Sequence, residues 1–264
     1  MEWKERQEKM ALIINADDFG RTEEVNQAIS ECFQLQYIDR TTLMVNMPYA
    51  DMAIKQAGEM GFIEQVGLHL NLTAGCPLTE KIRRNPLFCD AEGIFHAGFH
   101  KSLKTRLMMS AADVVQITEE LDAQIQKYLE YGCVLKHVDS HHHVHTDLPV
   151  LKALEPLLSK YGMRSIRIGR NLFTTGSLFN VVYKYYYNTR LNKTGLEQSD
   201  YFGSANDFRS YIRDRRLEAE PFLKRYQVEI MTHPMYDADG MLVDTCDPMN
   251  AEWCASLCRQ EKEN

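Results

Sequence analysis

The chain has 264 residues, of which 44% are hydrophobic and 25% charged, so it can bury a large core. Its formal net charge of -7 disfavours a nucleic-acid partner, because phosphate binding needs a surplus of Lys and Arg. No segment reaches the roughly 18 apolar residues of a membrane span, and the N-terminus shows no secretion signal. The seven cysteines lack Cys-x-x-Cys spacing. We therefore expect a cytoplasmic protein with reduced thiols and with no nucleic-acid or membrane partner.

Short apolar runs rich in β-branched residues alternate along the chain with segments of helical spacing. This pattern is typical of an α/β fold with a mostly parallel sheet. The predicted strands cover residues 12–16, 42–46, 66–71, 136–140, 165–169 and 228–232. The predicted helices cover residues 23–35, 49–59, 113–130, 149–161 and 206–218. We expect a single domain over residues 1–264, since one β/α barrel of about 250 residues uses nearly all of the chain.

Two longer regions without clear periodicity interrupt this alternation. They cover residues 73–110, after the third predicted strand, and residues 171–203, after the fifth. In β/α barrels the chemistry lies on loops beyond the carboxyl ends of the strands. We expect both insertions to shape a substrate cleft.

The first motif is Asn15-Ala16-Asp17-Asp18-Phe19-Gly20, where the first predicted strand ends. Two adjacent carboxylates repel each other and lose solvation on burial, unless a cation or a proton relieves them. A divalent metal ion does so. The alternative is a polar turn that caps the helix beginning near Glu23, because Asp is also favoured there.

Histidines follow three later strands. His69 and Asn71 share one face of the third predicted strand, and His233 precedes Pro234 at the end of the last one. For His69 the alternative is a hydrogen-bonded core histidine, and for His233 it is a simple turn. The fourth strand leads into the segment HVDSHHHVH, which holds five histidines in nine residues, at 137, 141, 142, 143 and 145.

This histidine cluster is internal, so it is not an expression tag. If the extended geometry continues, His141, His143 and His145 project to one side and His142 to the other. The carboxylates after strand one and the histidines after later strands would meet at one barrel mouth. Two histidines and one carboxylate leave open positions for water and substrate, as in a catalytic metal centre.

With these motifs, NADDFG and DSHHHVH above all, the sequence resembles the YdjC-like (ChbG/HpnK) carbohydrate deacetylases, distant relatives of the polysaccharide deacetylases. The resemblance extends from Leu12 to about Tyr236. It implies a distorted (β/α) barrel of the deacetylase type, which uses a divalent cation to hydrolyse the N-acetyl group of small amino sugars such as diacetylchitobiose. Relatives commonly have His-Pro-Gly at the last motif, whereas this chain has His-Pro-Met.

The resemblance also implies roles for individual residues. The metal ligands correspond to Asp18, His69 and His141. Asp17 corresponds to the base that activates water, and His233 to the general acid. We expect Asp139, His143 and His145 to support the ligands or contact the substrate. An inward Arg167 would pair with the acidic residues, although an exposed surface arginine is the alternative.

The family is commonly associated with magnesium, whereas two imidazole ligands favour zinc, manganese, iron, cobalt or nickel. Four tyrosines in residues 183–187 could stack on sugar rings, form a buried cluster or make the contact of a homodimer. Two alternative functions remain at this point. One is a metal-dependent phosphoesterase, and the other is a non-catalytic sugar-utilisation protein linked to a phosphotransferase system.

Overall fold

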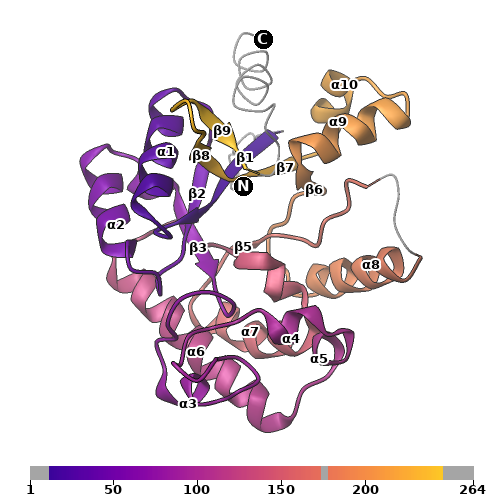
Figure 1. Cartoon of the computed structure of the whole chain (residues 1–264). Helices are drawn as coiled ribbons and strands as arrows, with labels where there is room; N and C mark the ends of the chain where they lie inside the picture. Colours follow the sequence, from indigo (N-terminus) through magenta and orange to yellow (C-terminus); the bar gives the residue numbers. More distant parts are fainter. Residues whose placement is uncertain (1–11, 174–177, 246–264) are drawn as a thin grey trace, which may run out of the picture.

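The computed structural model describes residues 12–173 and 178–245. Seven parallel strands form one curled sheet in the order β5-β4-β3-β2-β1-β7-β6 (Figure 1). This half-barrel confirms the predicted α/β fold with parallel strands. The strands are β1 (Leu12–Phe19), β2 (Arg40–Leu43), β3 (Val66–Leu70), β4 (His137–Ser140), β5 (Ser165–Ile166), β6 (Tyr201–Ser204) and β7 (Val228–Thr232). A separate antiparallel pair, β8 (Pro234–Tyr236) and β9 (Leu242–Asp244), follows β7.

Helices lie around this sheet (Figure 1). They are α1 (Glu23–Gln34), α2 (Ala50–Glu59), α3 (Glu80–Arg83), α4 (Gly98–Lys101), α5 (Leu103–Leu107), α6 (Ala111–Glu130), α7 (Leu148–Lys160), α8 (Leu178–Asn192), α9 (Ala205–Asp214) and α10 (Ala219–Arg225). Polar side chains cap several of them: Thr22 before α1, Ser110 before α6 and Ser204 before α9 each accept a hydrogen bond from a backbone N–H of the first turn.

The second insertion, residues 171–203, is more regular than its sequence suggests. It contains the 15-residue helix α8 and leads into strand β6. Aromatic and β-branched residues dominate α8, and their low helix propensity hides the helix in the sequence. The predicted helix at 206–218 is also wrong at its end, because α9 stops at Asp214 and Arg216 adopts a left-handed φ of 53°.

The sheet has one apolar face and one polar face. Alternate residues of the strands pack into the hydrophobic core, among them Leu12, Ile14, Leu43, Leu68, Val138 and Ile230. Many of the residues between them are polar and point the opposite way, although they are buried as well. The polar set includes Asn15, Asp17, Thr42, His69, Asp139 and Glu229. The polar groups on such a buried face must find hydrogen-bond or ionic partners within the protein. Several of them belong to the candidate active site described below.

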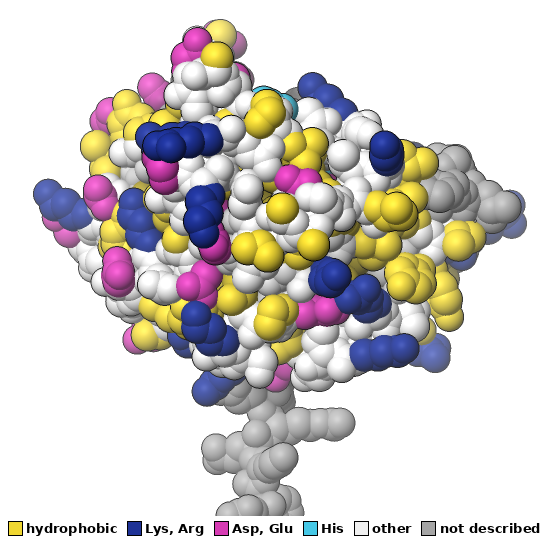
Figure 2. Space-filling view, turned by 90° about the horizontal axis from the view of Figure 1, so that it is seen from below, with side chains coloured by type: hydrophobic (Ala, Val, Ile, Leu, Met, Phe, Trp, Pro, Cys, Tyr) yellow, Lys and Arg dark blue, Asp and Glu magenta, His cyan; other side chains and the backbone are white. Residues whose placement is uncertain are grey.

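The surface carries charges of both signs. On the face in Figure 2, Lys and Arg side chains alternate with Asp and Glu, and hydrophobic side chains lie between them. Across residues 12–173 and 178–245, no helix is long and apolar enough to cross a membrane.

Candidate metal centre and active site

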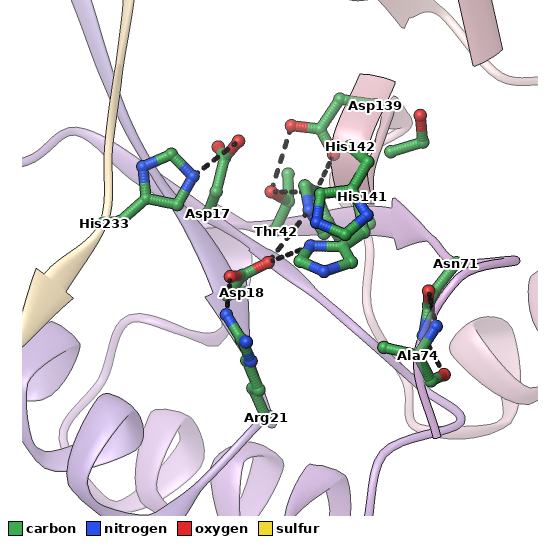
Figure 3. Close-up of polar contacts among 12 residues, drawn as sticks. Asp17, Asp18, Arg21, Thr42, Asn71, Ala74, Asp139, His141, His142 and His233 are labelled. Atoms are coloured by element: carbon green, nitrogen blue, oxygen red, sulfur yellow. Dashed lines mark hydrogen bonds and ion pairs between the residues drawn. The ribbon is translucent and has the colours of Figure 1, made fainter. Parts of the chain in front are cut away.

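Three side chains from the carboxyl ends of β1, β3 and β4 converge at one point. Oδ1 of Asp18 lies 2.7 Å from Nδ1 of His141 and 3.3 Å from Nε2 of His69. All three side chains are buried, and their ligand atoms lie within 4.8 Å of one another. Figure 3 shows Asp18 between the Arg21 and His141 side chains. The structure therefore brings together the three residues that the resemblance implies as metal ligands.

The backbone at Asp18 explains how two consecutive aspartates face the same site. In a regular strand, neighbouring side chains point to opposite faces of the sheet. Asp18 instead has a left-handed φ of 69°, and the pairing of β1 with β2 shifts register between Ala16 and Phe19. Asp tolerates this conformation better than most residues. The irregular strand end thus turns Asp18 toward the histidines, while Asp17 stays on the polar face.

The histidine cluster does not continue in extended form, so the predicted alternation of its side chains is wrong. Residues His141–Thr146 form a tight turn in which His142 and His143 have left-handed φ values of 53° and 56°. The His142 ring lies against that of His141, with 4.0 Å between centroids, and its Nδ1 is 3.0 Å from Oγ1 of Thr73. The turn leaves only His141 of this segment beside Asp18 and His69.

Asp139 and Thr42 hold the His69 ring in place through its Nδ1 atom. Its Nδ1 lies 2.6 Å from Oδ1 of Asp139, and Oγ1 of Thr42 lies 3.1 Å from both the imidazole and the other carboxylate oxygen. Burial disfavours the charged imidazole, but Asp139 and the two site aspartates outweigh it and raise the pKa of His69 to about 10. A carboxylate behind a metal-binding imidazole fixes the orientation of the ring and strengthens it as a ligand. Asp139 occupies that position here.

The chemistry of these donors fits a divalent cation. Oδ1 of Asp18 is buried and has no hydrogen-bond partner, although two imidazole nitrogens face it. The second oxygen of Asp18 accepts a hydrogen bond from Arg21 at 2.8 Å. An unpartnered buried carboxylate oxygen is costly unless a cation binds it. One carboxylate and two imidazoles match the donor set of a catalytic centre with open positions.

Asp17 lies beside this centre and is bound differently. Arg167 donates to both of its oxygens, with distances of 2.7 and 2.8 Å, and the amide of Asn15 donates to Oδ1 at 2.7 Å. Burial disfavours the carboxylate, but the Arg167 charge prevails and holds the pKa of Asp17 well below its usual range. Nε2 of His233 lies 3.9 Å from Oδ2 of Asp17 (Figure 3). Arg167 is fully buried and directed inward.

His143 and His145 belong to the same turn but are not in the group of ligand atoms around Asp18. His145 contacts Oγ of Ser140 through Nδ1 and the carbonyl of Arg167 through Nε2, at 3.1 Å for the latter. Burial and the nearby Arg167 charge lower the pKa of His145 to about 3, so this ring is neutral. It braces the turn. His143 packs near Phe202, with 5.5 Å between ring centroids, and lines a cavity.

This cavity, of about 190 Å³, is walled by α4, α5, α8 and the histidine turn, and it reaches the candidate metal centre through His142, whose ring lies against that of His141. Tyr183 of α8 contributes one wall, and its hydroxyl donates to the carbonyl of Thr146 at 2.7 Å. The other lining residues are His100, Arg106, His142, His143, Thr146, Gly169, Arg170, Asn180, Lys184 and Tyr187. Both insertions therefore contribute to it.

Sequence reasoning missed several residues of the polar face. Arg40 and Glu229 extend the contacts of Arg167, and Arg21 and Thr42 touch the metal centre. Glu229 gave a usable signal, because a lone carboxylate between Val228 and Ile230 in a buried strand must find a partner. Its partners lie 62 residues or more away in the chain, so the sequence does not identify them.

Several known proteins are similar in sequence to this chain. The family model described as YdjC-like protein matches residues 11–262. A carbohydrate deacetylase of Thermoanaerobacter pseudethanolicus is 32% identical over 236 residues, covering 88% of this chain and 83% of the relative. A carbohydrate deacetylase of Vibrio cholerae is 31% identical over 262 residues, covering 96% and 86%.

A solved structure from Enterococcus faecalis, described as a candidate cellobiose-phosphate cleavage protein, has a similar fold. The TM-score is 0.64 at 24% identity, with 95% of this chain and 92% of the other covered. The family model and the two relatives confirm the resemblance that the NADDFG and DSHHHVH motifs carry. The chain therefore belongs to the YdjC-like family, together with these carbohydrate deacetylases.

Proposed function

We propose that the protein is a metal-dependent carbohydrate deacetylase that hydrolyses the N-acetyl group of a small amino sugar such as diacetylchitobiose. The observation that carries this proposal is the buried oxygen of Asp18, which faces two imidazole nitrogens at 2.7 and 3.3 Å beside a second carboxylate, Asp17. The names of the relatives supply the substrate class, carbohydrate. The cavity lined by His142, the neighbour of His141 in the chain, would receive part of the sugar, with Tyr183 in its wall.

Asp18, His69 and His141 would hold the cation. When bound, a divalent cation polarises the acetyl carbonyl and lowers the pKa of water, which are the two services that amide hydrolysis needs. Asp139 keeps Nε2 of His69 directed at Asp18 by occupying its Nδ1. Arg21 restrains Asp18 through the outer oxygen.

Asp17 and His233 would move the protons of the reaction. The Arg167 charge holds the pKa of Asp17 well below its usual range, so this carboxylate is ionised at neutral pH, and in the proposed reaction it would take the proton of the attacking water. Arg167 and Asn15 fix the direction of that carboxylate. His233 lies across from Asp17 and donates a proton to the amine as it leaves. Acetate and a free amino sugar are the products.

For the identity of the metal, two imidazoles and one carboxylate favour zinc, manganese, iron, cobalt or nickel over magnesium. Elemental analysis of protein purified without added metal tests this preference. Full activity with magnesium after rigorous removal of transition metals would contradict it.

A metal-dependent phosphoesterase usually binds a second metal ion. The neighbouring group of Asp17, His69 and Asp139 is close enough for one. However, Arg167 contacts both of these carboxylates, at 2.7 and 2.8 Å, and already supplies the positive charge there. The arrangement therefore favours one metal and the deacetylase reaction.

The test is acetate release from N,N'-diacetylchitobiose by metal-stripped protein, with and without added divalent cations. We expect release only with a cation, and loss of release in His141→Ala. His96→Ala is the matched control, because this histidine lies in the first insertion and contacts the carbonyl of Pro86. Equal release from both variants, or release without metal, would refute the proposal.

A further inference from the structure

Five side chains on the polar face of the sheet form a closed chain of contacts, which we name the buried ring. Asn15 donates to Asp17 at 2.7 Å and accepts from Nε of Arg40 at 2.9 Å. The second carboxylate of the ring, Glu229 of β7, lies 2.9 Å from Arg40 and accepts from Nε of Arg167 at 2.6 Å. The bidentate pair of Arg167 and Asp17 closes the ring.

The ring is almost completely withdrawn from solvent. The side chain of Arg40 is 12% exposed, and those of Arg167 and Glu229 are 0% and 2% exposed. Each arginine charge in such a place needs a carboxylate partner, because an unpaired buried charge is costly. Glu229 is the one carboxylate of the ring that contacts both arginines. Glu229 therefore compensates the positive charges of both arginines next to Asp17.

Glu229 also restrains the orientation of the Arg167 guanidinium. This planar group presents Nε on one edge and the two Nη atoms on another. With Nε fixed to Glu229, both Nη atoms are directed at the oxygens of Asp17, and one of them also contacts Asp139 at 2.8 Å. Without that restraint, only the contacts of the Nη atoms with Asp17 and Asp139 hold the guanidinium, and we expect its alignment with Asp17 to loosen.

The same region does not suit a second cation. His137, Asp139 and Glu229 offer ligand atoms within 4.8 Å of one another. However, the oxygens of Glu229 face Arg40 and Arg167, and those of Asp139 face His69 and Arg167. The two arginines occupy the place that a metal ion would take.

We propose that Glu229 is a positioning residue for the hydrolysis, acting through Arg167 to aim the carboxylate of Asp17 at the reaction site. This inference rests on the proposed role of Asp17. Glu229 contacts the two arginines and none of Asp18, His69 and His141, so we expect its substitution to act on the base without removing a metal ligand.

The kinetic test compares Glu229→Gln with Glu120→Gln. Glu120 is a similarly buried glutamate of α6, whose carboxylate accepts hydrogen bonds from Leu78 and Thr79 of the first insertion. We expect Glu229→Gln to lower kcat by about 100-fold with KM and metal content unchanged, because a small misplacement of a reacting group has an effect of this size. Glu120→Gln should lower Tm and keep kcat. Glu229→Asp should fall between the wild type and Glu229→Gln.

A second readout does not depend on activity. The Nε–H signal of Arg167 in the NMR spectrum, assigned by its loss in Arg167→Lys, should lie downfield and exchange slowly in the metal-free protein. We expect it to move in Glu229→Gln and to stay in Glu120→Gln. If the protein releases no acetate at all, the proposed function fails, and this signal still tests the ring.

Several results would overturn the proposal. These are wild-type kcat in Glu229→Gln, a fall in kcat that matches that of Glu120→Gln at equal loss of Tm, and an unmoved Arg167 signal. Should Glu229→Gln fail to fold, Glu229→Asp carries the same test, because it keeps the charge but shortens the reach to Arg167. A kcat equal to that of the wild type in this folded variant would then refute the inference.

Discussion

Asp17 and Asp18 are neighbours in the chain but have opposite surroundings. Asp17 receives three hydrogen bonds, from Arg167 and Asn15, whereas Oδ1 of Asp18 faces two imidazole nitrogens, at 2.7 and 3.3 Å. The first carboxylate is thus bound by a permanent cation of the protein, and the second lies beside two groups that can bind a metal ion. This difference supports the proposed roles of Asp18 as a metal ligand and of Asp17 as the base.

We predict that Asp17→Asn abolishes turnover and spares metal binding. The amide keeps the shape of the side chain but cannot accept the proton of water, so kcat should fall by about 10²- to 10⁴-fold. Metal content by elemental analysis should match that of the wild type. A variant that loses its metal would instead make Asp17 a ligand.

Metal binding should depend on pH through His69. Asp139 and the site aspartates raise the pKa of this imidazole to about 10, so the metal-free protein holds a proton there at neutral pH. A cation that binds Nε2 must displace it, and affinity should rise by about tenfold per pH unit while one proton is released. Above pH 10 the dependence should flatten. Calorimetry in buffers of different ionisation enthalpy measures the proton release, and no release at pH 7 would contradict the account.

At the scale of elements, the sequence predicts the order of strands and helices well where the hydrophobic pattern is strong. Each of the six predicted strands overlaps an observed one, from β1 to β5 and β7. The misses have physical causes. Strand β6 is short and ends in Gly203 and Ser204, and α8 is built from residues that favour strands. Neither element shows hydrophobic residues at a regular spacing in the sequence.

The site was predictable in its residue types but not in its geometry. Alternation along a strand cannot reveal a left-handed residue, so the turn of Asp18 and that of His142 and His143 were out of reach. The sequence also does not show which side chains pair over long separations, and Arg167 and Asp17 are 150 residues apart. The sequence indicated an inward Arg167 only as one of two alternatives, and it did not connect Arg40 or Glu229 to the site.

Helix α8 separates the tyrosines of residues 183–187 into two kinds. Tyr183 lines the cavity beside the metal centre, whereas Tyr185 is 74% exposed and lines a different hollow. We predict that Tyr183→Ala raises KM for diacetylchitobiose by about tenfold, which corresponds to about 1.4 kcal/mol of binding. Tyr185→Ala is the matched control and should leave KM unchanged. The reverse result would move the sugar out of this cavity.

At the scale of the whole molecule, a bound cation should stabilise the fold. Asp18, His69 and His141 come from separate parts of the chain and meet only when it is folded, so a cation binds the folded state in preference to the unfolded one. Removal of the metal should therefore lower the free energy of unfolding. At a free cation concentration of 100 times Kd, binding adds about 2.7 kcal/mol of stability, which raises Tm by about 5 to 10 °C for a chain of this size.

Differential scanning calorimetry with and without chelator measures this shift. His141→Ala should show little of it, since it lacks one ligand. If the Tm of the wild type is the same with and without chelator, the site binds no metal in solution.

The most direct measurement is a titration of the metal-stripped protein with zinc or manganese, followed by acetate release from diacetylchitobiose. A single centre at Asp18, His69 and His141 predicts that activity rises from zero and reaches its plateau at one metal ion per chain. A plateau at two ions per chain, or full activity before any metal is added, would contradict the mononuclear deacetylase described above.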